Sequence, residues 1–272
     1  MVLLVYRLLR KMMHKSKVIG IIPARIGSRR LAQKPLIQIN GKPLIQNIYE
    51  RAAKSKLLDR LMVATDSSRI SDLVFAFGGE AHISLRNHPT GSDRVAEAAR
   101  NLNCDLVINI QCDLPNLSPA LVDELVSAML RERKVSMGTL ATRIADPARL
   151  KDPNVVKVVT DRNGWALYFS RHPLPYVRPD RASGPGFAGS ATDLKRTAFY
   201  EHIGIYGFRK SFLMRFASWE QTPLEKSEKL EQLRALENGA RIKVYLTKHK
   251  PVSLDVPSDI KRLRTPKGRM VR

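Results

Sequence analysis

The segment from Ile21 to Leu36, IIPARIGSRRLAQKPL, gathers positive charge directly after an apolar run. A glycine-containing turn at the end of a strand exposes backbone N–H groups, and guanidinium groups match the geometry of phosphate oxygens. The segment therefore predicts a phosphate-binding loop, with a solvated basic loop as the alternative. It lacks both the Gly-Lys-Ser/Thr of a P-loop and the spaced glycines of a dinucleotide-binding motif. Its cations are Arg25, Arg29, Arg30 and Lys34, with Gly27 among them.

A carboxylate, Asp113, stands just past the apolar run 105–110, in the sequence NIQCDLP. Ligands of open α/β sheets bind beyond the carboxyl ends of the strands. Mg²⁺ prefers one or two carboxylates together with phosphate oxygens of a substrate. Asp255 follows the apolar VSL near the other end of the chain and is expected to reach the same rim. The two residues predict a Mg²⁺ site, with a structural cap at a strand end as the alternative for Asp113.

The sequence HPTGSDR, residues 88–94, supplies a third loop and leads into an expected helix at 91–102. We expect Ser92 or Gly91 to cap this helix, because small polar residues and glycine satisfy its first N–H groups. Arg94 then lies near the helix start, a position that favours anions. An ordinary cap with a surface arginine is the alternative.

The elements that position these loops alternate between strands and helices. Such alternation predicts a mostly parallel, doubly wound α/β sheet with helices on both faces. The expected strands are 17–22, 61–65 and 105–110, and the expected helices are 42–56, 67–78, 91–102 and 118–133.

The pattern changes after residue 150, and we interpret residues 150–240 as an antiparallel-strand and helix insertion within one domain, 17–264. It should hold a hairpin over 154–170 with a tight turn at Asp161 to Gly164, a strand at 202–208 and one charged helix at 225–239. The segment 178–196 is rich in Gly, Ser, Ala and Pro and is expected to be a long loop, of a kind that often forms a lid. Strands at 241–247 and 252–256 complete the sheet.

The chain has 272 residues and a formal net charge of +22, and much of that charge lies at its ends. Residues 1–16 and 265–272 form basic tails that we expect to be poorly ordered. Weak contact with anionic surfaces is the alternative role for these tails. Two cysteines, Cys104 and Cys112, are too few for a disulfide framework, which fits a reducing cytoplasm. No apolar run approaches the roughly 20 residues needed to span a bilayer, and no signal peptide is expected.

Taken together, the motifs of the chain resemble one family in register from about Lys17 to Leu263. That family is the CMP-Kdo synthetases, or 3-deoxy-manno-octulosonate cytidylyltransferases. The matching segments are IIPARIGSRRLAQKPL, INGKPLI, VATDSSRI, FGGEAHIS, HPTGSDRVAE, INIQCDLP, DPNVVKVVTDRNGWALYFSR, HIGIYGFRKSFL, TPLEKSEKLEQLRALENG and LDVPSDI.

The resemblance implies a nucleotidyltransferase fold and a Mg²⁺-dependent transfer of the cytidylyl group of CTP to the acid sugar Kdo. This reaction releases pyrophosphate and gives the activated sugar of lipopolysaccharide assembly. The resemblance also implies a cytoplasmic homodimer, with residues 209–239 as the expected seat of dimerisation.

The same resemblance assigns roles to individual residues. It implies that Arg25, Lys34 and Asp113 are catalytic and that Asp113 and Asp255 hold the metal. The nucleotide would be bound by Arg25, Gly27, Ser28, Lys34 and Arg94. The sugar acid would be bound by Gln111, Arg171, His202, Tyr206, Glu231 and Gln232, with Arg171 pairing its carboxylate.

Three positions depart from the family pattern. Gln33 replaces a glycine before Lys34, which restricts the backbone of the loop. Cys112 replaces a glycine before Asp113, where a side chain would intrude if the residue needs a positive φ or lies close to the nucleotide. Leu114 replaces a frequent glutamate. These changes raise two alternatives: that the thiol of Cys112 is reactive, and that the protein is a non-catalytic homologue.

Alternative functions remain open from the sequence alone. A related acid sugar, such as the 8-amino analogue of Kdo or a sialic-type nonulosonate, could replace Kdo in the same chemistry. The pI of about 10.4 raises nucleic-acid binding as a different class of function. We expect no specific nucleic-acid binding, because the charge is concentrated in the tails and no nucleic-acid motif is present.

Overall fold

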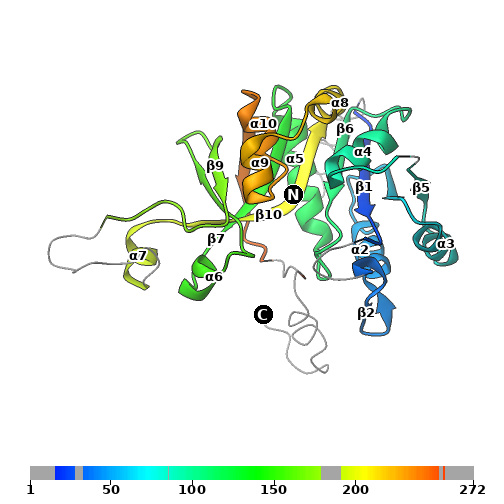
Figure 1. The fold of residues 1–272 in the computed structure, drawn as a ribbon, viewed down its shortest axis with the longest axis horizontal. Coiled ribbons are helices and arrows are strands. Elements are labelled where there is room, and N and C mark those ends of the chain that lie inside the picture. Colours follow the sequence, from blue (N-terminus) through cyan, green and yellow to red (C-terminus); the bar gives the residue numbers. More distant parts are fainter. Residues whose placement is uncertain (1–15, 28–32, 85, 179–190, 251–253, 255–272) are drawn as a thin grey trace, which may run out of the picture.

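The computed structural model describes residues 16–27, 33–84, 86–178, 191–250 and 254. Within these residues the chain forms one large sheet with the strand order β11-β7-β10-β6-β1-β4-β5, and β8 and β9 pair outside this path (Figure 1). The strands of the main path are β1 (Val18–Ala24), β4 (Arg60–Thr65), β5 (Ala81–Ile83), β6 (Leu106–Ile110), β7 (Met137–Arg143), β10 (Tyr200–Arg209) and β11 (Ile242–Leu246).

Most neighbours along the main path of this sheet are parallel, as the alternation of elements predicts. β1 pairs in parallel with β4 and β6, β4 with β5, and β11 with β7. β1 is buried along its whole length, because a parallel strand is covered on both faces and its sequence VIGIIPA has no polar alternation. The expected α/β fold is therefore confirmed.

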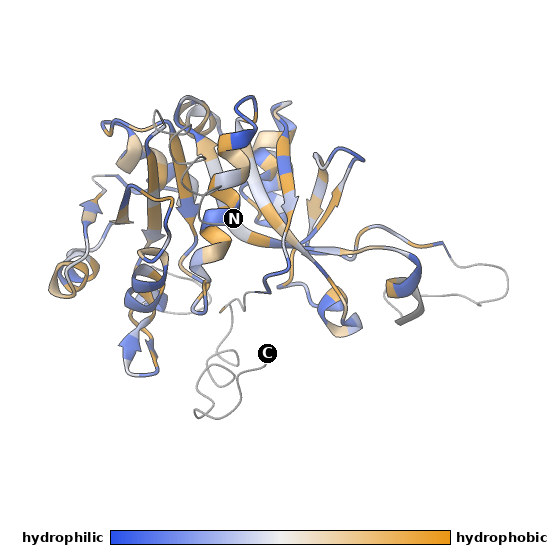
Figure 2. Ribbon diagram, turned by 180° about the vertical axis from the view of Figure 1, so that it is seen from behind, coloured by the Kyte–Doolittle hydropathy of each residue, from blue (hydrophilic) through white to orange (hydrophobic). Residues whose placement is uncertain are grey.

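Helices cover both faces of the sheet and form two hydrophobic clusters with it. Figure 2 shows the apolar residues concentrated on the central strands. One face is covered by α2 (Leu44–Ala52), α3 (Ser68–Ala76) and α5 (Pro119–Arg131), the other by α4 (Gly91–Ala99), α8 (Lys210–Ser218) and α10 (Leu233–Glu237). None of the helices in the described residues has both the length and the apolar composition needed to cross a bilayer.

The antiparallel segment expected after residue 150 is present and is joined closely to the sheet. β8 (Lys157–Thr160) and β9 (Ala166–Ser170) form the predicted hairpin, and β8 also pairs with β10. β10 lies between β6 and β7 and is antiparallel to both, so this segment contributes a central strand. On an arm beside the sheet, α6 (Pro147–Lys151) and α7 (Ala191–Arg196) help to form a small apolar cluster of their own (Figure 1).

Several local expectations are wrong. The single helix expected at 225–239 is two short helices, α9 (Pro223–Glu228) and α10, because Lys229 adopts a left-handed backbone with φ 55° and ends the first one. Thr90 caps α4, rather than Ser92 or Gly91, and forms a capping box with Asp93.

Other segments differ from the expected elements or lie outside the described residues. Residues 191–196 of the expected loop form α7, whereas 179–190 lie outside the described residues. The expected strand 252–256 also lies largely outside them. β7 has no counterpart among the expected strands, because its sequence MGTLATR lacks a clear apolar period.

Candidate functional site

A cleft of about 1140 Å³ opens at the carboxyl ends of β1 and β6 and beside β10. Its lining combines the ends of parallel strands with the turn between α9 and α10. Ligands of open α/β sheets bind at such strand ends. Eight of the residues assigned from the sequence line it: Arg25, Gln111, Asp113, Arg171, His202, Tyr206, Glu231 and Gln232.

Asp113 stands three residues beyond the end of β6, and its backbone carbonyl accepts a hydrogen bond of 2.8 Å from the N–H of Leu254. The late part of the chain therefore returns to the end of β6. Asp255 itself lies outside the described residues. Gly204 faces this point, since a Cβ added there would stand 4.0 Å from Oδ1 of Asp113 and 3.5 Å from Gln111. A glycine at this position keeps the space beside the carboxylate open.

A carboxylate at the rim of this cleft fits Mg²⁺, which needs only one or two protein carboxylates beside substrate oxygens. Within the described residues no group of three or more His, Cys, Asp or Glu could hold a metal by itself. The donor set is therefore suited to a hard cation that arrives with a phosphate ligand, and less to a closed protein cage.

The cationic loop begins immediately after β1, where Arg25 is exposed and faces the cleft. Lys34 begins the short 3₁₀ helix η1 (Lys34–Leu36). Its positive charge favours the thiolate of Cys112 and so lowers the pKa of that thiol, although burial raises it more. Lys34 is absent from the lining of the cleft, so its assignment to the nucleotide stays a prediction. Gly27 has nothing within 4 Å of an added Cβ, and Ser28 lies outside the described residues.

Arg94 is only 2% exposed, so the alternative of a surface arginine is wrong. Its Nη2 donates a 2.7 Å hydrogen bond to Asp66, which follows β4. Its Nη1 is buried, and no hydrogen-bond partner for this atom is found among the described residues. Arg94 is absent from the lining of the cleft, so its assignment to the nucleotide stays a prediction.

A polar network joins the floor of the cleft to the start of α4. Glu231 accepts hydrogen bonds from the N–H and the hydroxyl of Ser92 and from the amide of Gln111, at 3.1, 2.9 and 3.1 Å. Asn109 donates to the Ser92 hydroxyl at 3.0 Å. Burial raises the pKa of Glu231 above its usual value, and the donors from Ser92 oppose this shift. The carboxylate predicted to bind the sugar therefore also stabilises the helix terminus.

Arg234 anchors the α9–α10 segment to α4. Its guanidinium forms ion pairs of 2.7 Å with Asp93 and 2.8 Å with Glu225, and it lies over the ring of Phe216. Arg234 is 1% exposed, so each of these charges is compensated inside the protein. This anchor holds the end of the preceding turn, which carries Glu231 to the cleft.

The aromatic side of the cleft comes from β10. The hydroxyl of Tyr206 donates to Gln232 at 3.0 Å, and the ring of His202 packs between Phe169 and Tyr206. Burial lowers the pKa of His202 to about 3 and raises that of Tyr206 well above its usual value. Both side chains are therefore uncharged at neutral pH. This wall can bind hydroxyl groups without introducing charge.

Arg171 lines the cleft, and part of its guanidinium group forms hydrogen bonds to backbone carbonyls of the protein. Nε donates to the carbonyl of Glu228 at 2.8 Å and Nη1 to that of Pro153 at 2.9 Å. Behind it, the ammonium of the fully buried Lys157 donates to the carbonyls of Asp152, Val155 and Arg171. Pairing of Arg171 with a sugar carboxylate stays a prediction.

The comparisons with known proteins agree with one another. A cytidylyltransferase family model matches residues 19–242. The 3-deoxy-manno-octulosonate cytidylyltransferase of Geotalea uraniireducens is 46% identical over 254 residues, which cover 91% of this chain and 97% of that protein. The chain belongs to the 3-deoxy-manno-octulosonate cytidylyltransferase, or CMP-Kdo synthetase, family. It is accordingly a nucleotidyltransferase.

Two further comparisons extend over nearly the whole chain. The 3-deoxy-manno-octulosonate cytidylyltransferase of Geobacter sulfurreducens is 44% identical over 248 residues, covering 90% of this chain and 97% of that one. A solved CMP:2-keto-3-deoxy-manno-octonic acid synthetase complexed with CTP aligns with a TM-score of 0.80 and 35% identity. It covers 92% of this chain and 97% of that chain. The family resemblance read from the motifs is thus confirmed.

Gln33 and Cys112, which depart from the CMP-Kdo synthetase pattern, differ in backbone conformation. Gln33 does adopt the left-handed backbone expected of the glycine that it replaces, with φ 53° and ψ 33°, and its side chain accepts from Arg69 at 3.2 Å. Cys112 is not among the described residues with a positive φ. Burial raises the pKa of its thiol to about 12, which argues against a reactive thiolate.

Several residues of this CMP-Kdo synthetase site were not assigned from the sequence. Asp66 follows a strand end, as Asp113 does, so the same rule could have found it. The other contacts are hydrogen bonds to residues distant in the sequence, which a single motif cannot indicate. They are made by Ser92, Asn109, Thr139 and Lys157.

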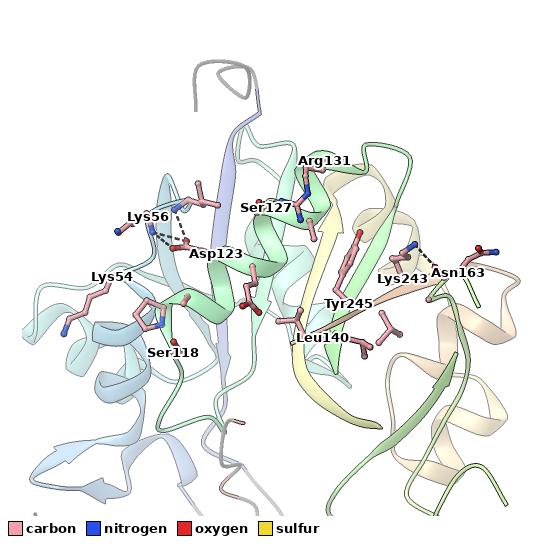
Figure 3. Close-up of a pocket in the computed structure, with 18 residues that line it drawn as sticks. Lys54, Lys56, Ser118, Asp123, Ser127, Arg131, Leu140, Asn163, Lys243 and Tyr245 are labelled. Carbon is pink, nitrogen blue, oxygen red and sulfur yellow. Dashed lines mark hydrogen bonds between the residues drawn. The ribbon is translucent and has the colours of Figure 1, made fainter. Parts of the chain in front are cut away.

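A second cavity, of about 890 Å³, lies between α5 and β11 and holds none of the assigned residues. Figure 3 shows Asp123 bonded to the backbone near Lys56 on one side of it and Lys243 reaching Asn163 on the other. Its charged groups are mostly paired within the protein. The cleft with Asp113 is the one that combines strand ends, cations and the family motifs.

Proposed function

We propose that this chain transfers the cytidylyl group of CTP to the anomeric hydroxyl of Kdo, giving CMP-Kdo and pyrophosphate. One observation carries the proposal: a single cleft contains Arg25 of the cationic loop, the carboxylate of Asp113 and the uncharged polar wall around His202. The cations and the carboxylate suit a triphosphate with its metal, and the uncharged wall suits a polyhydroxy acid. The names of the relatives support the same substrates.

In the proposed reaction the anomeric oxygen forms a bond to the α-phosphorus while the bond to the β-phosphate oxygen breaks. The protein contributes mainly positioning and compensation of charge, as is general for phosphoryl-type transfer. Arg25 and Lys34 stabilise the negative charge of the departing pyrophosphate, with Gly27, Ser28 and Arg94 assigned to the same nucleotide. Asp113, with Asp255, would hold Mg²⁺, which supplies Lewis-acid polarisation of the phosphate when it is bound. The hydrogen bond between Leu254 and Asp113 supports placing Asp255 at this rim.

The sugar end of the cleft is assigned to Gln111, Arg171, His202, Tyr206, Glu231 and Gln232. Burial lowers the pKa of His202 to about 3, so this residue binds hydroxyl groups and does not remove the proton of the nucleophile at neutral pH. The exposed Lys226 and Lys229 lie at the same cleft and add positive charge for an acid sugar.

The wider setting follows from the same proposal. We place the enzyme in the cytoplasm, in the supply of activated sugar for lipopolysaccharide, as a homodimer joined through residues 209–239. The basic tails would make only weak contact with anionic surfaces. Light scattering at micromolar concentration tests the dimer, and a monomer would refute it.

The reaction is tested by pyrophosphate release from the purified protein with CTP, Mg²⁺ and Kdo. We expect release only with all three components and a loss of at least about 100-fold in Asp113→Asn. Asp72→Asn, which changes an exposed carboxylate on α3, is the matched control and should keep full activity. Release without Kdo, or full activity in Asp113→Asn, would refute the proposal.

The choice of sugar is tested separately by competition of Kdo, its 8-amino analogue and a nonulosonate in one assay. We expect Kdo to have the largest kcat/KM. Preference for another acid sugar would keep the chemistry and change the substrate. Failure to bind Mg·CTP in calorimetry would instead indicate a non-catalytic homologue.

A further inference from the structure

The hydroxyl of Thr139, on β7, lies at a point where β10 departs from regular pairing. The register between the two strands shifts between Ile203 and Tyr206, which forms a bulge opposite Thr139. Such a bulge removes backbone groups from the ladder and re-aims neighbouring side chains, and bulges often lie next to active sites. His202 stands directly before this bulge and lines the cleft.

Thr139 contacts three polar atoms of β10 through its one hydroxyl oxygen. The distances are 2.7 Å to the carbonyl of Ile205, 3.3 Å to the carbonyl of Ile203 and 2.9 Å to Nε2 of His202. Thr139 is fully buried, so water does not compete for these contacts. The bulge carbonyl of Ile205 thus obtains the partner that regular pairing would have supplied.

A hydroxyl has one hydrogen to donate, and a carbonyl can only accept. The 2.7 Å contact to Ile205 therefore takes the hydrogen of Thr139, because two oxygens at that distance without a hydrogen between them would repel. Toward His202 the Thr139 oxygen can then only accept. The hydrogen in that contact must come from the imidazole, which places it on Nε2.

We propose that Thr139 is a positioning residue that holds His202 as the Nε2–H tautomer, so that Nδ1 is a hydrogen-bond acceptor for a hydroxyl group of the sugar. In a neutral imidazole one nitrogen donates and the other accepts. The ring is held between Phe169 and Tyr206, with centroids 5.1 and 5.3 Å away, which limits its rotation. Among the described residues no partner for Nδ1 is found.

The chemistry of the ligand follows from this assignment. An acceptor nitrogen recognises an alcohol O–H and repels a carboxylate oxygen, so His202 reads a hydroxyl and not the acid group of the sugar. The carboxylate must be bound elsewhere in the cleft, where Arg171, Lys226 and Lys229 stand. This inference about the ligand rests on the proposed function, whereas the tautomer itself does not.

The tautomer is tested first, in the full-length protein without substrate. Long-range ¹H–¹⁵N NMR separates protonated from unprotonated ring nitrogens, and comparison with His202→Gln identifies the signals of His202 among the six histidines. We expect a protonated Nε2 and an unprotonated Nδ1 at pH 7. The opposite pattern, or exchange between both tautomers, would overturn the proposal whatever the substrate is.

The role in recognition is tested by kinetics of two variants. Thr139→Val keeps the shape and removes the oxygen, whereas Thr139→Ser keeps the hydroxyl. We expect KM for Kdo to rise roughly tenfold in Thr139→Val, the loss of about one hydrogen bond, with binding of Mg·CTP unchanged. Thr139→Ser should remain within about twofold of the wild type.

The possible outcomes separate the two proposals. A folded Thr139→Val variant with unchanged KM and unchanged ring signals would refute the positioning role. If Thr139→Val does not fold, the wild-type spectrum and the kinetics of Thr139→Ser decide, and a tenfold loss in Thr139→Ser would count against the role. A wild-type protein that shows the expected tautomer but no activity with CTP and Kdo would refute the proposed function. The assignment of the His202 tautomer would then remain valid.

Discussion

The carboxylate of Glu231 accepts hydrogen bonds from both the N–H and the hydroxyl of Ser92, at 3.1 and 2.9 Å. These residues are 139 positions apart in the chain. Their contact joins the first turn of α4, which lies within the HPTGSDR sequence, to the break between α9 and α10. One wall of the cleft is therefore stabilised by a group that itself lines the cleft.

The charge of Glu231 should make stability depend on pH. Burial raises its folded pKa above the ordinary value of 4.5, so the folded protein holds this proton more tightly than the unfolded chain does. Ionisation of Glu231 therefore lowers stability as pH rises from 4.5 through the folded pKa. Glutamine cannot ionise, so Glu231→Gln should gain unfolding free energy relative to the wild type between pH 4 and pH 7.

Urea denaturation of both proteins at pH 4 and pH 7 measures this difference. Glu220→Gln, at an exposed position, is the control and should show almost no change with pH. A relative stability of Glu231→Gln that is constant or falls toward pH 7 would contradict the assigned shift.

The left-handed backbone of Gln33 should make a glycine favourable at this position. An L-residue with this backbone costs about 1–2 kcal/mol, and glycine avoids that cost while losing about 0.5–1 kcal/mol through its greater unfolded freedom. We expect Gln33→Gly to raise the unfolding free energy by up to about 1 kcal/mol. Gln38→Gly, in the extended strand β2 (Gln38–Ile39), should lower it instead. Equal effects at both positions in chemical denaturation would show that the backbone of Gln33 is not strained.

The thiol of Cys112 should resist alkylation in the folded protein. Burial raises its pKa to about 12, and the nearby charge of Lys34 opposes this shift without cancelling it. Because the thiolate is the nucleophile, reaction with iodoacetamide at pH 8 should be slow until the chain unfolds. Mass spectrometry of native and guanidine-treated samples measures this directly. Rapid native labelling of Cys112 that abolishes activity would restore the reactive-thiol alternative.

The buried ammonium of Lys157 should be important for both stability and the cleft wall. Lys157→Met leaves the carbonyls of Asp152, Val155 and Arg171 without this donor, which should lower the unfolding free energy by about 2–4 kcal/mol. Lys151→Met, an exposed lysine of α6, should change it by less than about 0.5 kcal/mol. Thermal and urea unfolding compare the two variants. A loss in Lys157→Met no larger than that of the control would show that the three contacts contribute little.

The parallel frame and the rim of the cleft could be predicted from the sequence because both depend on local patterns. Buried parallel strands are continuous apolar runs, as in β1 and β6, and the residue types that follow such runs indicate ligand sites. Arg25 and Asp113 were found in this way, and both line the cleft. Motif order along the chain then identified the family.

The tertiary structure decided the contacts that no local pattern carries. Lys229 divides an expected helix in two, because the turn that follows is held by the buried ion pairs of Arg234. Thr139 meets His202 only because the register of β7 and β10 shifts at a bulge. Strand register and burial arise from the packing of distant segments, and they determine protonation through desolvation. The sequence by itself therefore determined which chemical groups are present near the cleft, and the fold decided which of them are neutral, paired or aimed at a substrate.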